Sequence, residues 1–380
     1  MPLVHIKTFG CQANKSDSER ILGDYFARGF SETDDWKKAD EIVINTCSVR
    51  RSAEDRVRGF INNINKFFAT SSKPKIILTG CMLFRSEAQI RELLPEVDEV
   101  LPINEVGFNQ QAIRKDKIHA WVPVSSGCNS FCTYCIVPYS RGREVSRPEA
   151  DIVLEVENLA KIGFTEITLL GQNVNSYGLE KEGIALRKLY MESHLDLSSL
   201  PSNQSQYKKA KSTPPFVILL QKISKIDQIK KISFFTSNPW DFYDELIDEI
   251  AKNPKIDRFI HLPVQSGSNR ILEKMNRGYT RESYLALVSK IKTKIPEAVF
   301  GTDIIVGFPT ETDEDFHETV NLVKQIGFKV GFVARYSPRP GTVSSKLFPD
   351  DVSPAIKKMR WEILDKIINK DNLSVRPIVP

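Results

Sequence analysis

Three short apolar runs rich in β-branched residues recur in the first hundred residues, at 4–11, 41–47 and 75–81. Between them, apolar residues repeat with helical spacing, first after a helix-start pattern at 16–19 and then over 53–68. Strand and helix therefore alternate along this part of the chain, which predicts a parallel α/β sheet.

A second series of strand-like runs begins near residue 120 and has helical patterns between its members. The six runs lie at 120–125, 165–170, 231–236, 258–264, 299–306 and 330–336. The helical patterns include 148–162, 240–252, 280–294, 312–326 and a final one at 353–370. Six βα units in this length predict a partial (β/α)6 barrel, open on one side, whose chemistry lies on the loops after the strands.

A polar connector separates the two series. It covers 93–102 and 109–117, and it places the domain boundary near residue 118. We therefore predict an α/β protein with an N-terminal parallel-sheet domain over 1–117 and a partial barrel over 118–370.

Each of the first three apolar runs ends at a cysteine: Cys11, Cys47 and Cys81. In a parallel sheet the carboxyl ends of the strands share one edge, where open α/β sheets bind ligands. The alternative is three buried thiols that behave as small hydrophobic groups. Recurrence at the same position in successive units favours a site held by three thiolates.

The other three cysteines, Cys128, Cys132 and Cys135, follow one another at spacings of four and three residues directly after an apolar run. Three thiolates on a short loop can bind three irons of a four-iron cluster and leave the fourth open to a substrate or cofactor. A zinc loop is the alternative, but structural zinc normally has a fourth protein ligand, and none is obvious here.

Composition and charge exclude some classes of protein but do not indicate a function. The 380 residues carry a net charge of +5, which is compatible with a polyanionic partner without requiring one. No apolar run has the ~18 residues of a membrane span, and no secretory signal opens the chain, so the cytoplasm is expected. In that reducing compartment six cysteines indicate metal ligands or catalytic groups rather than disulfides.

The motifs around the cysteines resemble a known family. The C-x3-C-x2-C loop at 128–135 resembles the signature of radical S-adenosylmethionine (radical SAM) enzymes. The segments that contain the other cysteines, together with those downstream of the loop, resemble the radical SAM methylthiotransferases: 8–14, 17–19, 45–50, 79–82, 134–142 and 146–148. Among the branches of that family, the sequence is most similar to the MiaB-type tRNA-2-methylthio-N6-dimethylallyladenosine synthases.

The resemblance implies two [4Fe–4S] clusters and SAM. One cluster would be held by Cys128, Cys132 and Cys135, and an auxiliary one by Cys11, Cys47 and Cys81. The implied reaction adds a methylthio group to C2 of N6-dimethylallyladenosine, next to the anticodon in tRNA. The implied partners are a tRNA anticodon stem-loop, an electron donor such as flavodoxin or ferredoxin, and a sulfur source. A monomer without membrane contact is expected.

Other functions stay open at this point. Within the family, the substrate could be threonylcarbamoyladenosine in tRNA or a ribosomal protein. A different class of function is a non-catalytic iron–sulfur or zinc protein that binds RNA.

The loops after the barrel strands contain the polar groups expected to line a SAM pocket. The resemblance assigns cofactor binding to Gly171, Gln172, Asn173, Ser237, Gln265, Ser266, Asp303 and Arg335. Amide and hydroxyl groups can bond to the ribose and methionyl parts of SAM, and glycines allow close backbone approach. Turns and helix caps are the alternative for the glycines, and a satisfied core histidine is the alternative for His261. Arg141, Arg335 and Arg339 are expected either to contact a SAM carboxylate or RNA phosphate or to be ordinary surface arginines.

Two segments depart from the family pattern. Residues 178–214 are longer and more polar than the usual connection, which predicts a flexible insertion or, alternatively, an RNA-contacting arm. After the last helix, the tail at 371–380 stands where the family continues into a β-barrel RNA-binding domain called TRAM. That domain is expected to be absent, either because the chain is shortened or because it holds its substrate without that module.

Overall fold

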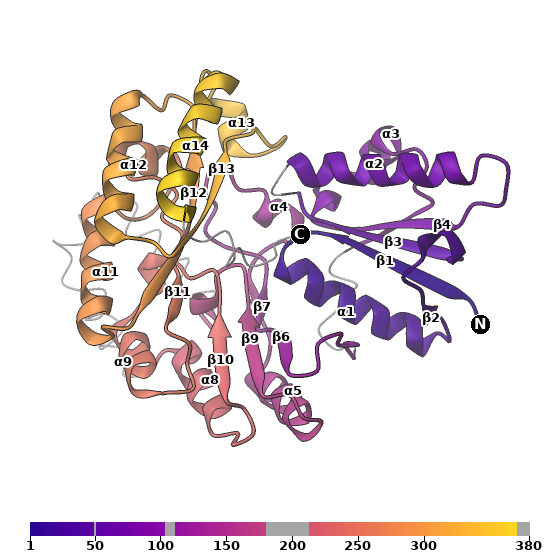
Figure 1. Ribbon diagram of the computed structural model, residues 1–380, viewed down its shortest axis with the longest axis horizontal. Coiled ribbons are helices and arrows are strands. Elements are labelled where there is room, and N and C mark those ends of the chain that lie inside the picture. The colour runs from indigo at the N-terminus through magenta and orange to yellow at the C-terminus, as the bar shows by residue number, and fades with distance from the viewer. Residues whose placement is uncertain (49–50, 103–110, 180–212, 371–380) are drawn as a thin grey trace. The chain divides into compact units, whose positions relative to one another are not determined.

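The computed structural model describes the chain except for residues 49–50, 103–110, 180–212 and 371–380 (Figure 1). By contacts, the described residues divide into two compact units. The N-terminal unit comprises Met1–Lys117 together with Ile136–Arg143, and the barrel unit comprises Ile118–Cys135 and the residues from Glu144 onward. A segment that follows the cysteine loop in sequence is therefore part of the N-terminal unit, which the sequence pattern did not predict.

The N-terminal unit is a five-stranded, fully parallel sheet in the order β2-β1-β3-β4-β5. Its strands are β1 (Leu3–Phe9), β2 (Ser31–Glu32), β3 (Glu41–Thr46), β4 (Lys75–Gly80) and β5 (Glu99–Leu101). Helix α1 (Gln12–Ala27) covers one face, and α2 (Arg51–Phe67) and α3 (Glu87–Leu93) lie over the other (Figure 1).

Alternation along the central strands explains why both faces are covered. On β3, Ile42 and Ile44 pack toward the α2 side, whereas Val43 packs toward α1. The α2 side is completed by Val57, Ile61 and Ile64, and the α1 side by Ile21, Leu22 and Tyr25. Each such fully buried aliphatic side chain contributes roughly 1.5–3 kcal/mol relative to exposure, so the sheet is stabilised on both faces.

The prediction of a connector over 93–102 is wrong for part of that stretch. Helix α3 ends at Leu93, Leu94 and Val97 are buried in the α2-side core, and β5 adds an edge strand. Strand β5 has three residues and β2 has two, so neither is long enough to show an alternating pattern in the sequence.

The barrel unit contains the six predicted parallel strands. They are β6 (His119–Pro123), β9 (Glu166–Leu170), β10 (Lys231–Phe234), β11 (Phe259–His261), β12 (Val299–Val306) and β13 (Val330–Arg335). The strands pair as β10-β9-β6 and as β11-β12-β13. A parallel bridge from Ile232 to Ile256 and a bond from Ser237 N to His261 O (3.2 Å) join β10 to the β11 side. The predicted α/β class and partial barrel are confirmed.

Helices cover the outside of these strands (Figure 1). They are α5 (Glu149–Lys161), α8 (Pro215–Ser224), α9 (Asp244–Lys252), α11 (Arg281–Lys294), α12 (Asp313–Ile326) and α14 (Pro354–Asn369). Capping boxes at Thr280 and Thr312 explain where α11 and α12 begin. Helix α9 starts later than the predicted 240 because Pro239–Asp241 forms a separate 3₁₀ turn, η5. Helix α8 was not predicted.

Short elements complete the barrel unit: the antiparallel pair β7 (Ser125–Ser126) and β8 (Val145–Ser146), the 3₁₀ turn η4 (Val174–Ser176), and the helices α10 (Asn269–Lys274) and α13 (Val343–Leu347). The predicted insertion at 178–214 lies almost wholly outside the described residues, and the tail at 371–380 lies wholly outside them. None of the helices in the described ranges combines the length and the apolar character needed to cross a lipid bilayer.

Candidate functional site

The cysteines of the N-terminal unit follow three neighbouring strands. Sheet register aligns Phe9 with Thr46 and Thr46 with Gly80, at the ends of β1, β3 and β4. Cys47 and Cys81 come directly after two of these aligned residues, and Cys11 comes two residues after the third. Neighbouring strands lie about 4.8 Å apart, so the sheet collects the three thiols at one edge.

Glycines before two of these cysteines make room for the arrangement. Gly80 has φ +98° and ψ −161°, a region that is essentially restricted to glycine, and a Cβ there would lie 2.3 Å from Thr46 O. A Cβ on Gly10 would lie 2.3 Å from Asn14 Oδ1. Any other residue would displace the backbone that leads into Cys81 or the side chain that supports Cys11.

A buried amide network lies behind Cys11, which is the N-cap residue of α1. Asn14 Oδ1 accepts from the backbone N (3.3 Å) and Sγ (3.5 Å) of Cys11, and Asn14 Nδ2 donates to Asn45 Oδ1 (2.9 Å). Asn45 Nδ2 in turn donates to Ser18 Oγ (2.9 Å). The residues around the first two cysteines thus tie β3 to α1 and hold Cys11 in place.

Arg141 supplies a positive charge to this set of cysteines. It follows α4 (Val137–Ser140) in the N-terminal unit, and its Nε donates to Cys81 Sγ at 3.2 Å while Nη2 pairs with Asp17 at 2.6 Å. A hydrogen bond with Cys47 lowers the pKa of Cys81 against the effect of burial, and Arg141 lowers it further. Burial raises the pKa of Cys11.

The partners of Arg141 differ from those expected. We predicted either a contact with SAM or RNA or an ordinary surface arginine, but the side chain is 5% exposed and is bound by Asp17 and Cys81. The sequence showed the arginine within the family motif without showing that its partner would be a thiol from another segment of the chain.

The barrel cysteines lie on a tightly turned loop after β7. Gly127 (φ +77°) and Phe131 (φ +46°) have left-handed backbone conformations that place Cys128 and Cys132 in buried positions and leave Cys135 half-buried. Ser130 N donates to Cys128 Sγ (3.4 Å). Burial raises the pKa of Cys128 to about 11, with hydrogen bonds from Ser130 acting in the opposite sense.

Residues 274–277, the last residue of α10 and the three that follow it, anchor this loop. Thr133 donates from its backbone N to Met275 O (3.0 Å) and from Oγ1 to Lys274 O (2.8 Å). Asn276 Nδ2 donates to Phe131 O (2.9 Å). The guanidinium of the next residue, Arg277, donates from Nη1 to Cys132 Sγ (3.2 Å). Sequence reasoning missed this anchor, because a short helix followed by Asn-Arg-Gly signals only a turn.

The donor sets fit iron–sulfur clusters in their chemistry: each consists of three cysteine thiols, mostly buried, at the carboxyl ends of parallel strands or on a loop that follows one. Within the part of the chain that the structure describes, no three His, Cys, Asp or Glu side chains are placed to hold a single metal ion. A four-iron cluster requires a wider arrangement, because each thiolate binds a different iron.

Two of the predicted SAM-pocket residues carry buried polar atoms without a hydrogen-bond partner among the described residues. These are Asn173 Oδ1, after β9, and Ser237 Oγ, after β10. Asn173 Nδ2 donates to Asp241 Oδ2 (3.0 Å), which orients the amide. Because buried polar groups are normally satisfied, both atoms fit contacts to a polar ligand.

Other residues of the predicted pocket are packed against, or hydrogen-bonded to, other parts of the protein. A Cβ on Gly171 would lie 2.7 Å from Ser125 Oγ, so the glycine permits a close approach. Gln172 is half-buried beside it, and Ser266 is fully buried with its Oγ 3.3 Å from Thr319 Oγ1. Gln265 has φ +70°, and its backbone bonds on both sides to β12.

The remaining predicted residues lie on β12 and β13. Asp303 Oδ2 is 3.3 Å from Nε2 of His261, whose Nδ1 accepts from Thr236 N (3.2 Å). His261 is buried, but only its Nδ1 has a hydrogen-bond partner; its Nε2 has none among the described residues, so the histidine is satisfied on one side of the ring only. Arg335 is exposed at the end of β13, whereas Arg339 is buried.

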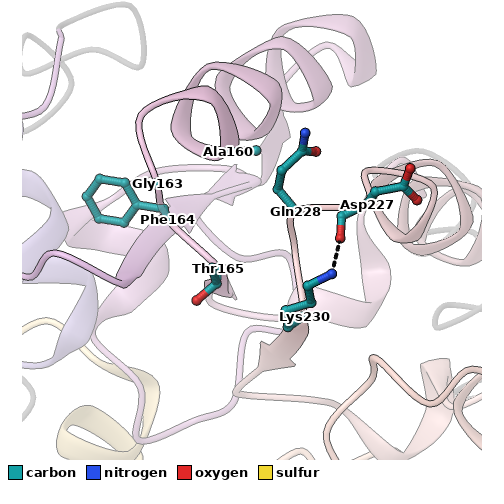
Figure 2. Close-up of a pocket in the computed structure, with 7 residues that line it drawn as sticks. All are labelled: Ala160, Gly163, Phe164, Thr165, Asp227, Gln228 and Lys230. Atoms are coloured by element: carbon teal, nitrogen blue, oxygen red, sulfur yellow. Dashed lines mark hydrogen bonds between the residues drawn. The ribbon is translucent and has the colours of Figure 1, made fainter.

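Figure 2 shows a shallow pocket of about 360 Å³ in the barrel unit. Thr165 and Lys230 line it directly before β9 and β10, and Lys230 Nζ donates to Asp227 O (2.7 Å). The pocket is therefore at the amino ends of these strands, whereas Asn173 follows the carboxyl end of β9 and the cysteine loop follows β6 and β7. Since barrels of this type place their chemistry at the carboxyl ends, the pocket is not the candidate site.

A partial parallel barrel with a C-x3-C-x2-C loop defines the class of the chain as radical SAM, and residues 122–323 match the Radical SAM superfamily. Residues 3–102 match the uncharacterized protein family UPF0004. The tRNA-2-methylthio-N(6)-dimethylallyladenosine synthase of Thermotoga petrophila is 40% identical over 392 residues, covering 97% of this chain and 82% of that protein. The synthase of the same name from Thermoanaerobacter pseudethanolicus is 39% identical, covering 97% of this chain and 78% of that protein. The chain belongs to the family of these synthases.

Solved structures share the fold at low sequence identity. The radical SAM methyltransferase TsrM from Kitasatospora setae matches 91% of this chain and 77% of its own, with a TM-score of 0.57 and 14% identity. The cobalamin-dependent radical SAM enzyme OxsB matches 97% of this chain and 55% of its own, with a TM-score of 0.54 and 10% identity. Membership of the radical SAM superfamily implies SAM and a [4Fe–4S] cluster.

Proposed function

We propose that this chain transfers a methylthio group to C2 of N6-dimethylallyladenosine in tRNA. Relatives that share 38–40% identity over nearly the whole chain bear the name of this activity. The observation that carries the proposal is the second cysteine set, Cys11, Cys47 and Cys81, in a chain that also has the radical SAM loop. A radical SAM enzyme that only cleaves SAM has no need of that set.

In this proposal Cys128, Cys132 and Cys135 hold one [4Fe–4S] cluster and the three sheet-edge cysteines hold a second. When bound, the clusters supply the electron that cleaves SAM and the sulfur that is transferred. The residues of this chain bind, orient and charge-balance these groups.

In the N-terminal unit, Asn14 fixes the backbone and thiol of Cys11, and Arg141 offers a guanidinium to the thiolate of Cys81. In the barrel unit, the unpartnered Asn173 Oδ1 and Ser237 Oγ are assigned to SAM, together with the other predicted pocket residues. The methyl group transferred with the sulfur comes from a second SAM.

The substrate is proposed to be the anticodon stem-loop, because an enzyme acting on a base carbon needs that base unstacked, as it is in a single-stranded loop. A one-electron donor such as flavodoxin or ferredoxin and a sulfur source complete the partners. We place the reaction in the cytoplasm and expect a monomer.

The decisive experiment is mass spectrometry of tRNA nucleosides from a bacterial strain that lacks its own synthase and expresses this chain. The expected result is that 2-methylthio-N6-dimethylallyladenosine returns with the wild-type chain and not with the matched variant Cys47→Ala. Methylthiolation of threonylcarbamoyladenosine or of a ribosomal protein would move the chain to another branch of the family. If no methylthio product forms while anaerobically loaded protein yields no 5′-deoxyadenosine from SAM and reductant, the non-catalytic alternative is correct.

A further inference from the structure

Arg277 is a buried arginine whose surroundings differ from those of other buried arginines in the chain. It lies between α10 and α11 and is 9% exposed. Four other arginines with side chains 3–6% exposed each pair with a carboxylate at 2.6–2.7 Å: Arg114 with Glu19, Arg141 with Asp17, Arg147 with Glu155 and Arg360 with Glu311. Among the residues that the structure describes, Arg277 pairs with no aspartate or glutamate.

The guanidinium is held in one orientation by neutral acceptors. Nε donates to Tyr279 Oη (3.0 Å), and Nη2 donates to Pro263 O (3.2 Å) and Asn238 Oδ1 (3.4 Å). Its faces lie against aromatic rings, with the guanidinium carbon 5.0 Å from the centroid of Trp240 and 5.2 Å from that of Tyr279. These contacts fix the direction of the remaining donor, Nη1.

That remaining donor points at a cysteine of the radical SAM loop: Nη1 lies 3.2 Å from Cys132 Sγ. The other acceptors of the guanidinium are a phenol oxygen, a side-chain amide oxygen and a backbone carbonyl, which are neutral groups. A buried charge without a counter-charge is strongly unfavourable. Among the described residues, Cys132 Sγ is therefore the contact of Arg277 that can supply a counter-charge once its sulfur binds a cluster.

The position of Cys132 is not free either. The residues just before Arg277 bond to Phe131 and Thr133, on both sides of this cysteine, through Asn276 Nδ2, Met275 O and Lys274 O. Phe131 (φ +46°) and Asn276 (φ +56°) both have left-handed backbone conformations. Residues 274–277 thus hold the cysteine loop in place and position the guanidinium of Arg277 beside Cys132 Sγ.

We propose that Arg277 is a positioning residue that acts as the built-in counter-charge of the cluster bound at Cys128, Cys132 and Cys135, and that it raises the reduction potential of that cluster through Cys132. The inference rests on the cluster ligation proposed above. Hydrogen bonds to cluster sulfurs and nearby net charge are principal determinants of cluster potential. A positive charge stabilises the reduced form, which carries one more negative charge, so it makes the reduction that precedes SAM cleavage easier.

The test uses the full-length chain, reconstituted anaerobically with iron and sulfide and carrying Cys47→Ala, so that the signal comes from the barrel cluster whether or not a second one forms. Three variants are compared in this background. Arg277→Met removes the charge at similar volume, and Arg277→Lys retains the charge without the planar fork. Arg281→Met removes a charge from a nearby half-buried arginine. Iron per chain and the midpoint potential from an EPR-monitored titration are measured for each.

At the midpoint potential of the parent, we expect the ratio of reduced to oxidised cluster to fall at least tenfold in Arg277→Met, a shift of about 59 mV to more negative potential for one electron. Arg277→Lys should shift less, and Arg281→Met should not shift. A change smaller than twofold in Arg277→Met with iron retained would overturn the proposal.

Loss of the cluster is also informative. If Arg277→Met folds, as judged by its thermal transition, but binds no iron while Arg277→Lys does, the charge is required for assembly and the proposal stands. If Lys and Met fail equally, the role is structural packing and the proposal is wrong. The potential does not depend on tRNA, so a negative tRNA assay would overturn the proposed substrate and leave this measurement intact.

Discussion

Replacing Gly80 with alanine should disrupt the N-terminal cysteine site without touching a cysteine. Gly80 ends β4 and leads into Cys81. A Cβ at this position would lie 2.3 Å from Thr46 O, 2.6 Å from Asn45 Oδ1 and 2.8 Å from Thr46 N. Two of these atoms are backbone of the neighbouring strand β3, so β3 and β4 must separate to admit the methyl group.

The magnitude has two parts. A non-glycine residue in the backbone region of Gly80, with φ +98° and ψ −161°, costs about 1–3 kcal/mol. Overpacking against the fixed backbone of β3 costs about 1–3 kcal/mol more. A loss of roughly 2–6 kcal/mol is a large part of the 5–15 kcal/mol that stabilises a typical domain.

Hydrogen exchange of the full-length apo-protein, followed by mass spectrometry, measures this loss in the strands concerned. Peptides from β3 and β4 should exchange at least about 30-fold faster in Gly80→Ala, since each 1.4 kcal/mol is a factor of ten. The matched control is Gly59→Ala, an exposed glycine in α2 with no atom within 4 Å of the added Cβ. That substitution should stabilise the helix by about 0.5–1 kcal/mol.

After reconstitution, Gly80→Ala should lose the iron bound by the N-terminal cysteines and keep reductive SAM cleavage. Exchange of β4 within about threefold of the wild-type rate would show that the strand accommodates the methyl group, and the strain argument would be wrong. Equal acceleration in Gly59→Ala would point to general destabilisation by handling rather than to the position of Gly80.

Two further outcomes test the division of roles and the electrostatics. Cys132→Ala should abolish formation of 5′-deoxyadenosine from SAM. Cys47→Ala should still form 5′-deoxyadenosine, but it should lose the methylthio product and bind about four irons in place of about eight. Loss of SAM cleavage in both variants would contradict the assignment. For Asp315, burial favours the protonated form, but hydrogen bonds from Arg270, Ser268 and Thr312 lower the pKa to about 2. A lowered pKa stabilises the fold above the ordinary value of 3.8, and this stability is lost as pH falls through about 2. Because Arg270 is partly exposed, the loss of stability is on the order of 1–2 kcal/mol. In urea unfolding, Asp315→Asn should therefore destabilise the protein at pH 6 and much less at pH 2. An equal effect at both pH values would refute the argument.

The elements with strong local signals were predictable from the sequence. The six barrel strands and their main helices have apolar repeats long enough to show their period, and their observed bounds agree with the predicted ones within a few residues. Strand β5 and the anchor at 274–277 were missed because a strand of three residues and a turn have no period to detect. The start of helix α9 was predicted too early for the same reason, because the 3₁₀ turn at Pro239–Asp241 has no period that separates it from the helix.

The positions of the cysteines follow from the sequence, whereas the arginines beside them are placed by the tertiary structure. The spacing of Cys128, Cys132 and Cys135 is a property of one loop, and the place of Cys11, Cys47 and Cys81 at strand ends follows from the repetition of one βα unit. Both were therefore determined by the sequence alone. The arginines were decided by the tertiary structure: Arg141 contacts Cys81 across 60 residues of chain, and Arg277 contacts Cys132 across 145. Such pairings depend on which segments the fold brings together, and no local periodicity records them. The motifs show where the cysteines stand in the chain, whereas only the folded structure brings the arginines next to them.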